Sequence, residues 1–144
     1  MDLRTQLIGF EGWRNQAYPD PLTHGDPWTC GVGETGPDVG PGTYWDDATV
    51  GARLDAQIAR CTGQVLSALP WAAGLNDARQ AVLIGMAFQL GLGGLVAFHN
   101  TLSAVQAGNW ALASLGMQNS VWARQTPERA SVLSQQMLTG EWPA

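Results

Sequence analysis

The sequence predicts an α+β fold that is mainly helical, and two patterns indicate it. Apolar residues recur at spacings of three and four along much of the chain, which is the period of amphipathic helices. Residues 13–35 instead carry an alternating run, Trp28, Cys30 and Val32, among prolines and glycines, which indicates short antiparallel strands. At 144 residues the chain is one domain, or two small lobes that share a core.

The first predicted helix begins at Leu3, with Asp2 as its N-cap and Leu7 and Phe10 on the same face. Gly12 ends this helix or lies just past its end. Glu11 is therefore expected in the last helical turn or just beyond it.

The following stretch predicts a β-hairpin with an irregular turn. Asp20 lies between Pro19 and Pro21, so its backbone is restricted and its side chain is expected to point from a loop. Residues 36–43, GPDVGPGT, form a loop by composition.

Helices account for the rest of the chain. One begins near Asp46 or Asp47 and ends before Pro70, and the next is capped by Asn76 or Asp77 and broken by the LGLGGL run. Shorter helices are predicted over 100–107, 109–115 and 120–124. The last has Thr126 as its cap, Pro127 at its first position and Gly140 at its end.

Composition argues against several classes of function. The formal charge is −5, all seven basic residues are Arg, and no basic patch is present, so nucleic acid is not an expected partner. No run of eighteen apolar residues and no secretory signal are found, so neither a transmembrane segment nor stable membrane insertion is expected. Cys30 and Cys61 are expected as buried thiols rather than as a bridge, and no His/Cys cluster has the spacing of a metal site.

Glu11 and Asp20 are the first candidates for chemistry. Two carboxylates on different elements can lie on opposite sides of a bound sugar, where one serves as acid and the other as base. The spacing alone is common, and a solvated helix end followed by an Asp turn explains it equally well.

The wider stretch resembles the T-even phage-type lysozymes, also called the phage endolysin family, glycoside hydrolase family twenty-four. That family is built around E-G-x-R-x-x-x-Y-x-D and a downstream T-x-G-x-G. The matching residues are Glu11, Gly12, Arg14, Tyr18, Asp20, Thr29, Gly31 and Gly33. A second block keeps the order of the family: Met86, Phe88, Gln89, Gly91, Phe98, Asn100, Leu102, Trp110, Trp122, Gln125, Thr126, Pro127, Arg129 and Ala130. Cys30 and the TGPDVGPGTY run resemble the lambdoid-endolysin branch.

The resemblance implies a lysozyme-like fold over residues 1–144. A small N-terminal lobe of about 13–55 would carry the β-hairpin, and a bridging helix would join it to a helical lobe of 1–12 and 56–144. The implied activity is that of an N-acetylmuramidase, a bacteriolytic hydrolase that cleaves the β-1,4 bond between N-acetylmuramic acid and N-acetylglucosamine in peptidoglycan. The family uses no cofactor or metal.

The resemblance also implies roles for individual residues. Glu11 would be the general acid, Asp20 the base or the stabiliser of oxocarbenium charge, and Thr29 the group that holds the water. In the family, the Arg that matches Arg129 reaches back to the catalytic Glu. Positions that bind or support the substrate would be Gly31, Gly33, Phe88, Gln89, Asn100, Gln125 and Arg129. Trp122 is expected in the core rather than as a sugar platform.

The chain departs from the family in three places. Eight residues separate Asp20 from Thr29, which is longer than in T-even members. Asp26 in this insertion is a rival for the base. Glu34 stands where T-even members have His, which puts the supporting ion pair of the family in doubt and leaves a third carboxylate near the cleft.

Two other functions remain open at this point: a wall-binding module, inactive or part of a virion, and a lytic transglycosylase. The expected partner is the glycan strand of peptidoglycan, and the chain is expected to act as a monomer. The expected location is the host cytoplasm until release to the cell wall or periplasm during host cell lysis, or the virion.

Overall fold

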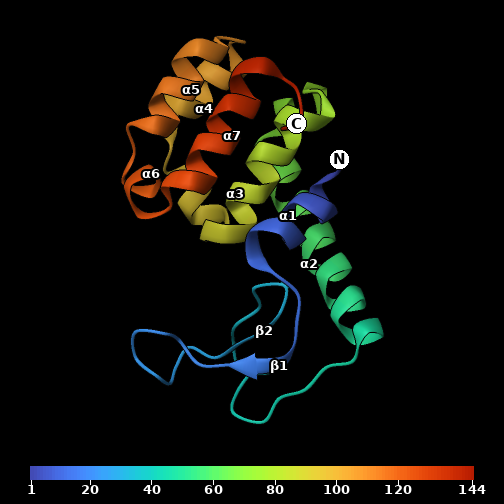
Figure 1. Ribbon diagram of the computed structural model, residues 1–144. Coiled ribbons are helices and arrows are strands. Elements are labelled where there is room, and N and C mark those ends of the chain that lie inside the picture. The colour runs from blue at the N-terminus through green and yellow to red at the C-terminus, as the bar shows by residue number, and fades with distance from the viewer. The chain divides into compact units, whose positions relative to one another are not determined.

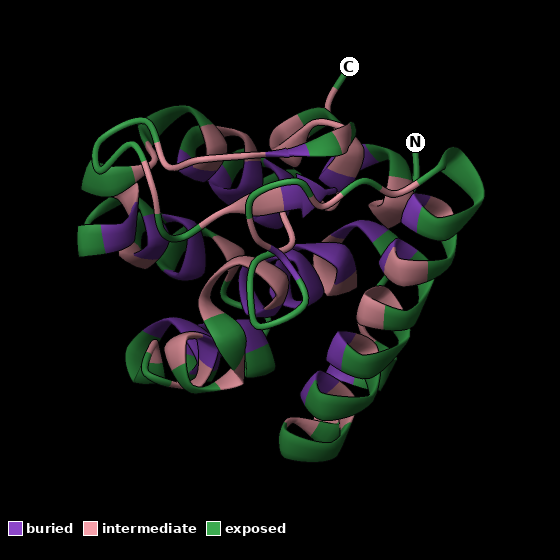
Figure 2. Cartoon of the chain, turned by 90° about the horizontal axis from the view of Figure 1, so that it is seen from below, coloured by how far each residue is buried: buried purple, intermediate pink, exposed green.

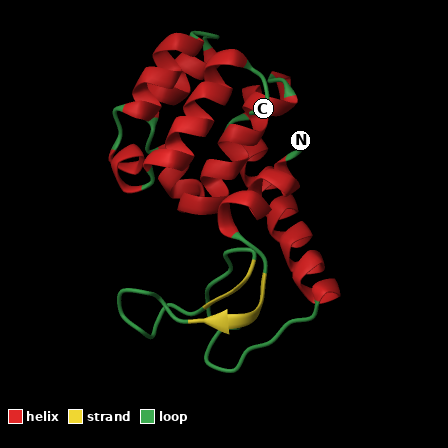
Figure 3. Cartoon of the chain, viewed as in Figure 1, coloured by secondary structure: helices red, strands yellow, loops and turns green.

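Seven α-helices, one short 3-10 helix and a two-stranded antiparallel sheet follow one another along the chain in the computed structural model, which describes residues 1–144 (Figure 1). The predicted α+β, mainly helical class is confirmed. Contacts divide the chain into two units: an N-terminal unit of residues 3–59, and a C-terminal unit of residues 60–144 with residues 1–2. The sheet belongs to the N-terminal unit (Figure 3).

The N-terminal unit begins with α1 (Leu3–Glu11), which ends where Gly12 adopts a φ of 81° and donates its N–H to the carbonyl of Ile8 at 2.8 Å. The positive φ is a conformation that favours glycine, so the predicted stop is confirmed. Helix α1 falls within this unit, whereas the predicted lobe boundary assigned residues 1–12 to the helical part. A 2.8 Å ion pair between Arg4 and Asp55 shows one contact that ties α1 to the rest of the unit.

The predicted hairpin consists of β1 (Arg14–Tyr18) and β2 (Thr29–Gly31). Arg14 pairs with Gly31 and Tyr18 pairs with Thr29, and the register shifts between these two pairs. Ala17 and Cys30 of the hairpin form a small buried cluster with Val39, and Trp28 and Trp45 pack against it. Residues 36–43 contain turns and no strand, as predicted.

Helix α2 (Asp47–Ala68) starts in the N-terminal unit and ends in the C-terminal unit. Asp46 caps it by accepting the N–H of Thr49 at 2.8 Å, in agreement with the predicted start. Buried Val50 and Leu54 lie four residues apart on one face. The helix stops two residues before Pro70, which cannot continue it because proline has no N–H to donate.

The C-terminal unit is organised by α3 (Asp77–Val96), which follows the 3-10 helix Pro70–Gly74. Asn76 caps α3 by accepting the N–H of Arg79 at 3.0 Å. The predicted break in LGLGGL occurs at Gly91, whose φ is 76°, and the chain resumes a helical path to Val96. By length and composition alone α3 could cross a membrane, but Ala78 and the continuous run 81–87 are buried, as in the core helix of a globular unit.

Four shorter helices complete this unit: α4 (His99–Gln106), α5 (Trp110–Gln118), α6 (Val121–Gln125) and α7 (Pro127–Thr139). Helix α7 packs against α3, α5 and α6. Buried positions recur along the helices and alternate with exposed ones (Figure 2), which is the pattern of amphipathic helices around a shared core.

The end of α6 corrects one sequence prediction. Thr126 holds the N-cap position of α7, yet its side chain makes no capping hydrogen bond. Its hydroxyl donates instead to the carbonyl of Trp122 at 3.0 Å. The threonine side chain thus satisfies a carbonyl at the end of α6 instead of an N–H group at the start of α7.

Both cysteines are free and buried, which confirms the prediction of two thiols. Burial raises the pKa of the Cys30 thiol and of the Cys61 thiol. Cys30 donates weakly to the carbonyls of Arg14 and Asn15 at 3.5 and 3.4 Å, so it serves the packing of the hairpin.

Candidate active site

Glu11 and the glycine turn after β2 meet within the N-terminal unit. A Cβ atom built on Gly33 would overlap Oε2 of Glu11 and come within 2.8 Å of its Cδ. Gly33 also has a φ of 68°, so its backbone favours glycine, and the carboxyl of Glu11 occupies the space that a side chain would need there. The carboxyl group of Glu11, half-buried at the end of α1, therefore lies directly against this turn.

Gly31 has a different neighbour on the same turn. Its φ is 66°, and a Cβ built on it would come within 3.2 Å of the indole of Trp45. Backbone bonds between Cys30 and Glu34, at 2.9 and 3.0 Å, close the turn around Val32 and Gly33. The two glycines of the T-x-G-x-G motif thus serve close packing, one against the small core and one against Glu11.

Asp20 organises the loop between the two strands. Its Oδ1 atom accepts the backbone N–H groups of Leu22 at 2.7 Å and Thr23 at 3.1 Å. Its own N–H donates to the carbonyl of Gly25 at 2.9 Å, and its carbonyl accepts the N–H of His24 at 2.8 Å. One carboxylate oxygen is thus committed to the turn, and Oδ2 keeps its capacity to accept hydrogen bonds from a ligand.

Asp26, the rival candidate, lies in the same loop with its side chain exposed. Its backbone carbonyl accepts the hydroxyl of Thr23 at 2.7 Å, whereas no protein group holds its carboxylate. Asp20 is therefore the fixed carboxylate of the hairpin loop and Asp26 a solvated one.

Thr29 is the first residue of β2, half-buried and paired across the hairpin with Tyr18. Its neighbour Cys30 points into the small core, so the side chain of Thr29 lies on the other face of the strand. On the strand opposite, the guanidinium of Arg14 lies 4.4 Å from the centroid of the Tyr18 ring. Strand β2 and the turn after it therefore carry Thr29, Gly31 and Gly33 in one short segment, of which Gly33 lies against Glu11.

Glu34 corrects the sequence analysis, because it is not a spare carboxylate. Arg53 of α2 donates to both of its oxygens, at 2.6 and 2.9 Å, and also to Asp38 at 3.2 Å. The guanidinium lies 4.1 Å from the centroid of the Trp45 ring. Glu34, the residue after Gly33, therefore forms an ion pair with Arg53 of α2.

Sequence reasoning missed Arg53. The bonds to Glu34 raise the pKa of its guanidinium, which stays charged. The sequence did place Arg53 beside the buried face of the predicted helix, three residues after Val50, where its side chain could reach a partner in the same unit. Its partner, nineteen residues earlier, could not be identified from that spacing.

The other five candidate residues lie in the C-terminal unit. Phe88 and Gln89, both half-buried, are neighbours on α3. Gln89 accepts the indole N–H of Trp122 at 2.9 Å, which supplies the partner that a polar residue on an apolar face requires. Trp122 is 4% exposed, which confirms its prediction as a core residue.

Asn100, Gln125 and Arg129 occupy three different helices of this unit. Asn100 is exposed near the start of α4 and lines a hollow of about 510 Å³ with residues of α4 and α5. Gln125 is the exposed last residue of α6. Arg129 is half-buried in the first turn of α7, and its Nε and Nη2 atoms are shielded from solvent.

Known proteins similar to this chain include a phage peptidoglycan hydrolase, a phage spike protein and probable T4-type lysozymes. The model of a family described as phage lysozyme matches residues 8–135. Peptidoglycan hydrolase gp36 of Pseudomonas phage phiKMV is 34% identical over 139 residues, which cover 93% of this chain and 15% of that protein. The pre-baseplate central spike protein Gp5 of Enterobacteria phage T4 is 43% identical over 66 residues, 46% of this chain and 12% of that protein.

A further relative is a probable T4-type lysozyme 1 of Dictyostelium discoideum, 33% identical over 66 residues, which cover 46% of this chain and 39% of that protein. The matched segments thus span between 12% and 39% of the length of these three relatives.

Proposed function

The chain belongs to the phage lysozyme family, and from this premise we propose that it is a glycoside hydrolase acting on bacterial peptidoglycan. The bond cleaved is the β-1,4 bond between N-acetylmuramic acid and N-acetylglucosamine. The proposal rests on one contact: the carboxyl of Glu11 lies against Gly33, two residues after the strand that begins with Thr29. The name of the phiKMV relative, a peptidoglycan hydrolase, supports the choice of substrate.

In this proposal Glu11 is the general acid and protonates the oxygen of the leaving sugar. Glu11 lies on the last turn of α1, half-buried, with its carboxyl against Gly33. A longer side chain at position 33 would occupy the space that the carboxyl needs. The glycine therefore supports the role of Glu11.

Asp20 is the base that activates water, and Thr29 helps to hold that water. The Oδ1 atom of Asp20 is fixed by two backbone N–H groups, which leaves Oδ2 to accept the proton of the water. A threonine hydroxyl can donate to a carboxylate and accept from water at the same time. A water between base and sugar requires a separation of about 6.5–9.5 Å between the two carboxyl groups and gives inversion at the anomeric carbon.

Phe88, Gln89, Asn100, Gln125 and Arg129 keep the supporting roles that the resemblance implies. For Gln89 the support is specific, because its carboxamide is oriented by the indole of Trp122. We also propose that the chain acts as a monomer, without cofactor. It serves either in lysis of the host or, as the T4 spike relative suggests, within a virion.

Mass spectrometry of digested cell walls tests the activity. We expect muropeptides with N-acetylmuramic acid at a reducing end. An anhydro end would identify a lytic transglycosylase, and undigested walls would identify a binding module. Glu11→Gln is the matched control, since it keeps the shape of the side chain but cannot supply the proton.

Proton NMR of the first product from a soluble wall oligosaccharide tests the mechanism. We expect the α anomer, which results from direct attack of water on a β bond. A β anomer would indicate a covalent or substrate-assisted route and would remove Thr29 from its role.

A further inference from the structure

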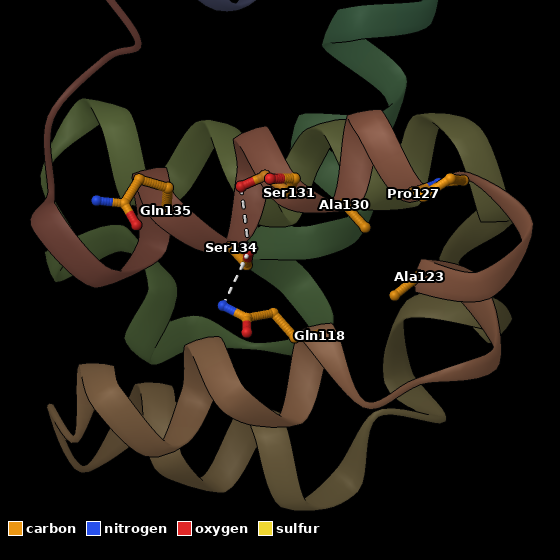
Figure 4. A pocket seen from close by; sticks show the side chains of 7 residues that line it. All are labelled: Gln118, Ala123, Pro127, Ala130, Ser131, Ser134 and Gln135. Atoms are coloured by element: carbon orange, nitrogen blue, oxygen red, sulfur yellow. Dashed lines mark hydrogen bonds between the residues drawn. The ribbon is translucent and has the colours of Figure 1, made fainter.

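A pocket in the C-terminal unit lies outside every residue assigned above. It encloses about 410 Å³ and is lined by Gln118, Ala123, Pro127, Ala130, Ser131, Ser134 and Gln135 (Figure 4). The lining residues come from the end of α5, from α6 and from one face of α7. We call it the Gln118 pocket.

One side of the Gln118 pocket is polar and partly fixed. The Nε2 group of Gln118 donates to Ser114 at 3.2 Å and to Ser134 at 3.4 Å, and the hydroxyl of Ser134 donates to the carbonyl of Ser131 at 3.1 Å. Both N–H bonds of the amide are engaged, so its Oε1 atom remains as an oriented acceptor. Gln135, on the same side, makes no side-chain hydrogen bond and offers both a donor and an acceptor.

The other side of the pocket is small and apolar. Ala123, Pro127 and Ala130 lie there together in Figure 4, opposite Gln118 and Gln135. Ala130 is 2% exposed and forms part of the floor. These side chains leave room for a methyl group and offer it van der Waals contact.

Charge limits the class of ligand. No lining residue is ionisable, and the whole chain carries a formal charge of −5. A phosphate or carboxylate would find neither Arg nor Lys in the pocket, and a cation would find no carboxylate. The pocket therefore suits a neutral ligand with hydrogen-bonding groups and one small apolar end.

We propose that the Gln118 pocket is a second glycan-binding site that takes the acetamido group of an N-acetylated sugar. The acetamido N–H donates to Oε1 of Gln118, and its methyl packs on Ala123 and Ala130. The choice of a wall sugar, rather than another acetamide, rests on the proposed function. The site itself is separate from the residues assigned to catalysis.

Such a site would act on the polymer and not on the bond cleaved. A second contact on the same chain raises the effective concentration of a long glycan near the enzyme, whereas a short oligosaccharide cannot gain from it. Loss of the pocket should therefore slow the clearing of intact walls and leave hydrolysis of a short soluble substrate unchanged.

Titration of the isotopically labelled full chain, followed by amide NMR, tests the binding. We expect N-acetylglucosamine to shift the signals of Ala123, Ala130 and Ser131 saturably, with a dissociation constant on the order of 1 mM, as is reasonable for so small a ligand. Glucose, which has a hydroxyl in place of the acetamido group, should bind at least about tenfold more weakly, because the hydrogen bond from the acetamido N–H and the packing of its methyl group are lost.

Two variants locate the site. Gln118→Leu should weaken the binding of N-acetylglucosamine about tenfold, since it removes the acceptor. Ala123→Leu fills the apolar side and should do the same, which keeps the test open if the first variant does not fold. Gln106→Leu is the matched control, because Gln106 is also the exposed last residue of a helix and lies outside the pocket.

Several results would overturn the inference. These are the absence of saturable shifts at the three amides, shifts confined to residues 3–59, equal binding of glucose, and equal binding by Gln118→Leu. Preferential binding of N-acetylalanine amide would assign the pocket to a peptide instead. None of these measurements requires hydrolysis, so failure here is distinct from failure of the proposed function, which the digestion of walls by the unmodified protein decides.

Discussion

The N-terminal and C-terminal units are held together by different balances of contact. Residues 3–59 bury Leu7, Val50, Leu54 and the small cluster of Ala17, Cys30 and Val39, and their loops are fixed by ion pairs, side-chain hydrogen bonds and glycines. Residues 60–144 bury long apolar side chains along α3, α5 and α7, among them Leu83, Met86, Met117, Leu133 and Met137.

This difference has a consequence for function. Burial is non-directional, so the helical unit tolerates small shifts of its side chains. Hydrogen bonds and ion pairs fix directions, and the hairpin, loop and turn that depend on them carry Asp20 and Thr29 and contact Glu11. Substitutions in the N-terminal unit should therefore reduce activity more than stability, and substitutions in the helical core the reverse.

The largest expected effect on activity is that of Asp20→Asn. The variant keeps an acceptor for the N–H groups of Leu22 and Thr23 but loses the base, so turnover should fall by about 10²–10⁴-fold. Asp26→Asn, in the same loop, is the control and should change turnover little because its carboxylate is exposed. Rates on a soluble oligosaccharide decide, and the opposite ranking would move the base to Asp26.

Leu133→Ala should give the largest loss of stability. Leu133 is 1% exposed on α7, and truncation of a buried leucine leaves a cavity that costs about 2–5 kcal/mol. Turnover of the folded fraction, measured well below the melting temperature, should stay close to that of the unmodified protein. Denaturant unfolding gives the free energy, and a change of less than about 1 kcal/mol would contradict the role of this core.

Gly33→Ala should separate activity from stability in the other unit. A left-handed backbone costs a non-glycine residue about 1–3 kcal/mol, and the added methyl group would displace the carboxyl of Glu11. We expect a loss of turnover greater than the loss of folded protein explains. Gly36→Ala is the control, with positive φ but open space at Cβ. Equal turnover in the two variants would count against the contact.

Arg53→Met should have a smaller effect on stability. Breaking a fully buried pair costs about 3–5 kcal/mol and an exposed pair about 0–1 kcal/mol. Since Arg53 and Glu34 are 33% and 15% exposed, we expect a loss of about 1–2 kcal/mol. Arg4→Met, which breaks the exposed pair with Asp55, is the control and should cost less than about 1 kcal/mol. Chemical denaturation compares them, and equal losses would show that Arg53 contributes no more than an exposed pair.

The smallest effect concerns pH. Hydrogen bonds from Asn15 and then Trp13 lower the pKa of Asp47 below its ordinary value. A lowered folded-state pKa means that the stability contributed is present above the ordinary value and is lost as pH falls through the lowered one. Asp47→Asn should therefore be less stable than the unmodified protein at neutral pH, with the difference shrinking in acid. Thermal melts across pH test this, and a difference independent of pH would contradict it.

The sequence by itself determined much of the architecture, because those signals are local. Apolar spacing, caps and breakers located the helices to within a few residues, and the position of Glu11 before Gly12 followed from one helix and its stop. The alternation around Cys30 was enough for the hairpin, and the motif residues defined the candidate site before any contact was known.

Tertiary structure alone decided the partners. The pairing of Glu34 with Arg53, the indole bond to Gln89, the hydroxyl of Thr126 turned to α6 and the grouping of α1 with residues up to 59 all depend on side-chain or chain placement that residue spacing does not encode. By resemblance, Glu34 stands where T-even members have His. Only the fold showed that Glu34 pairs with Arg53 of α2, because a hydrogen bond depends on where two groups lie in space and not on the number of residues between them.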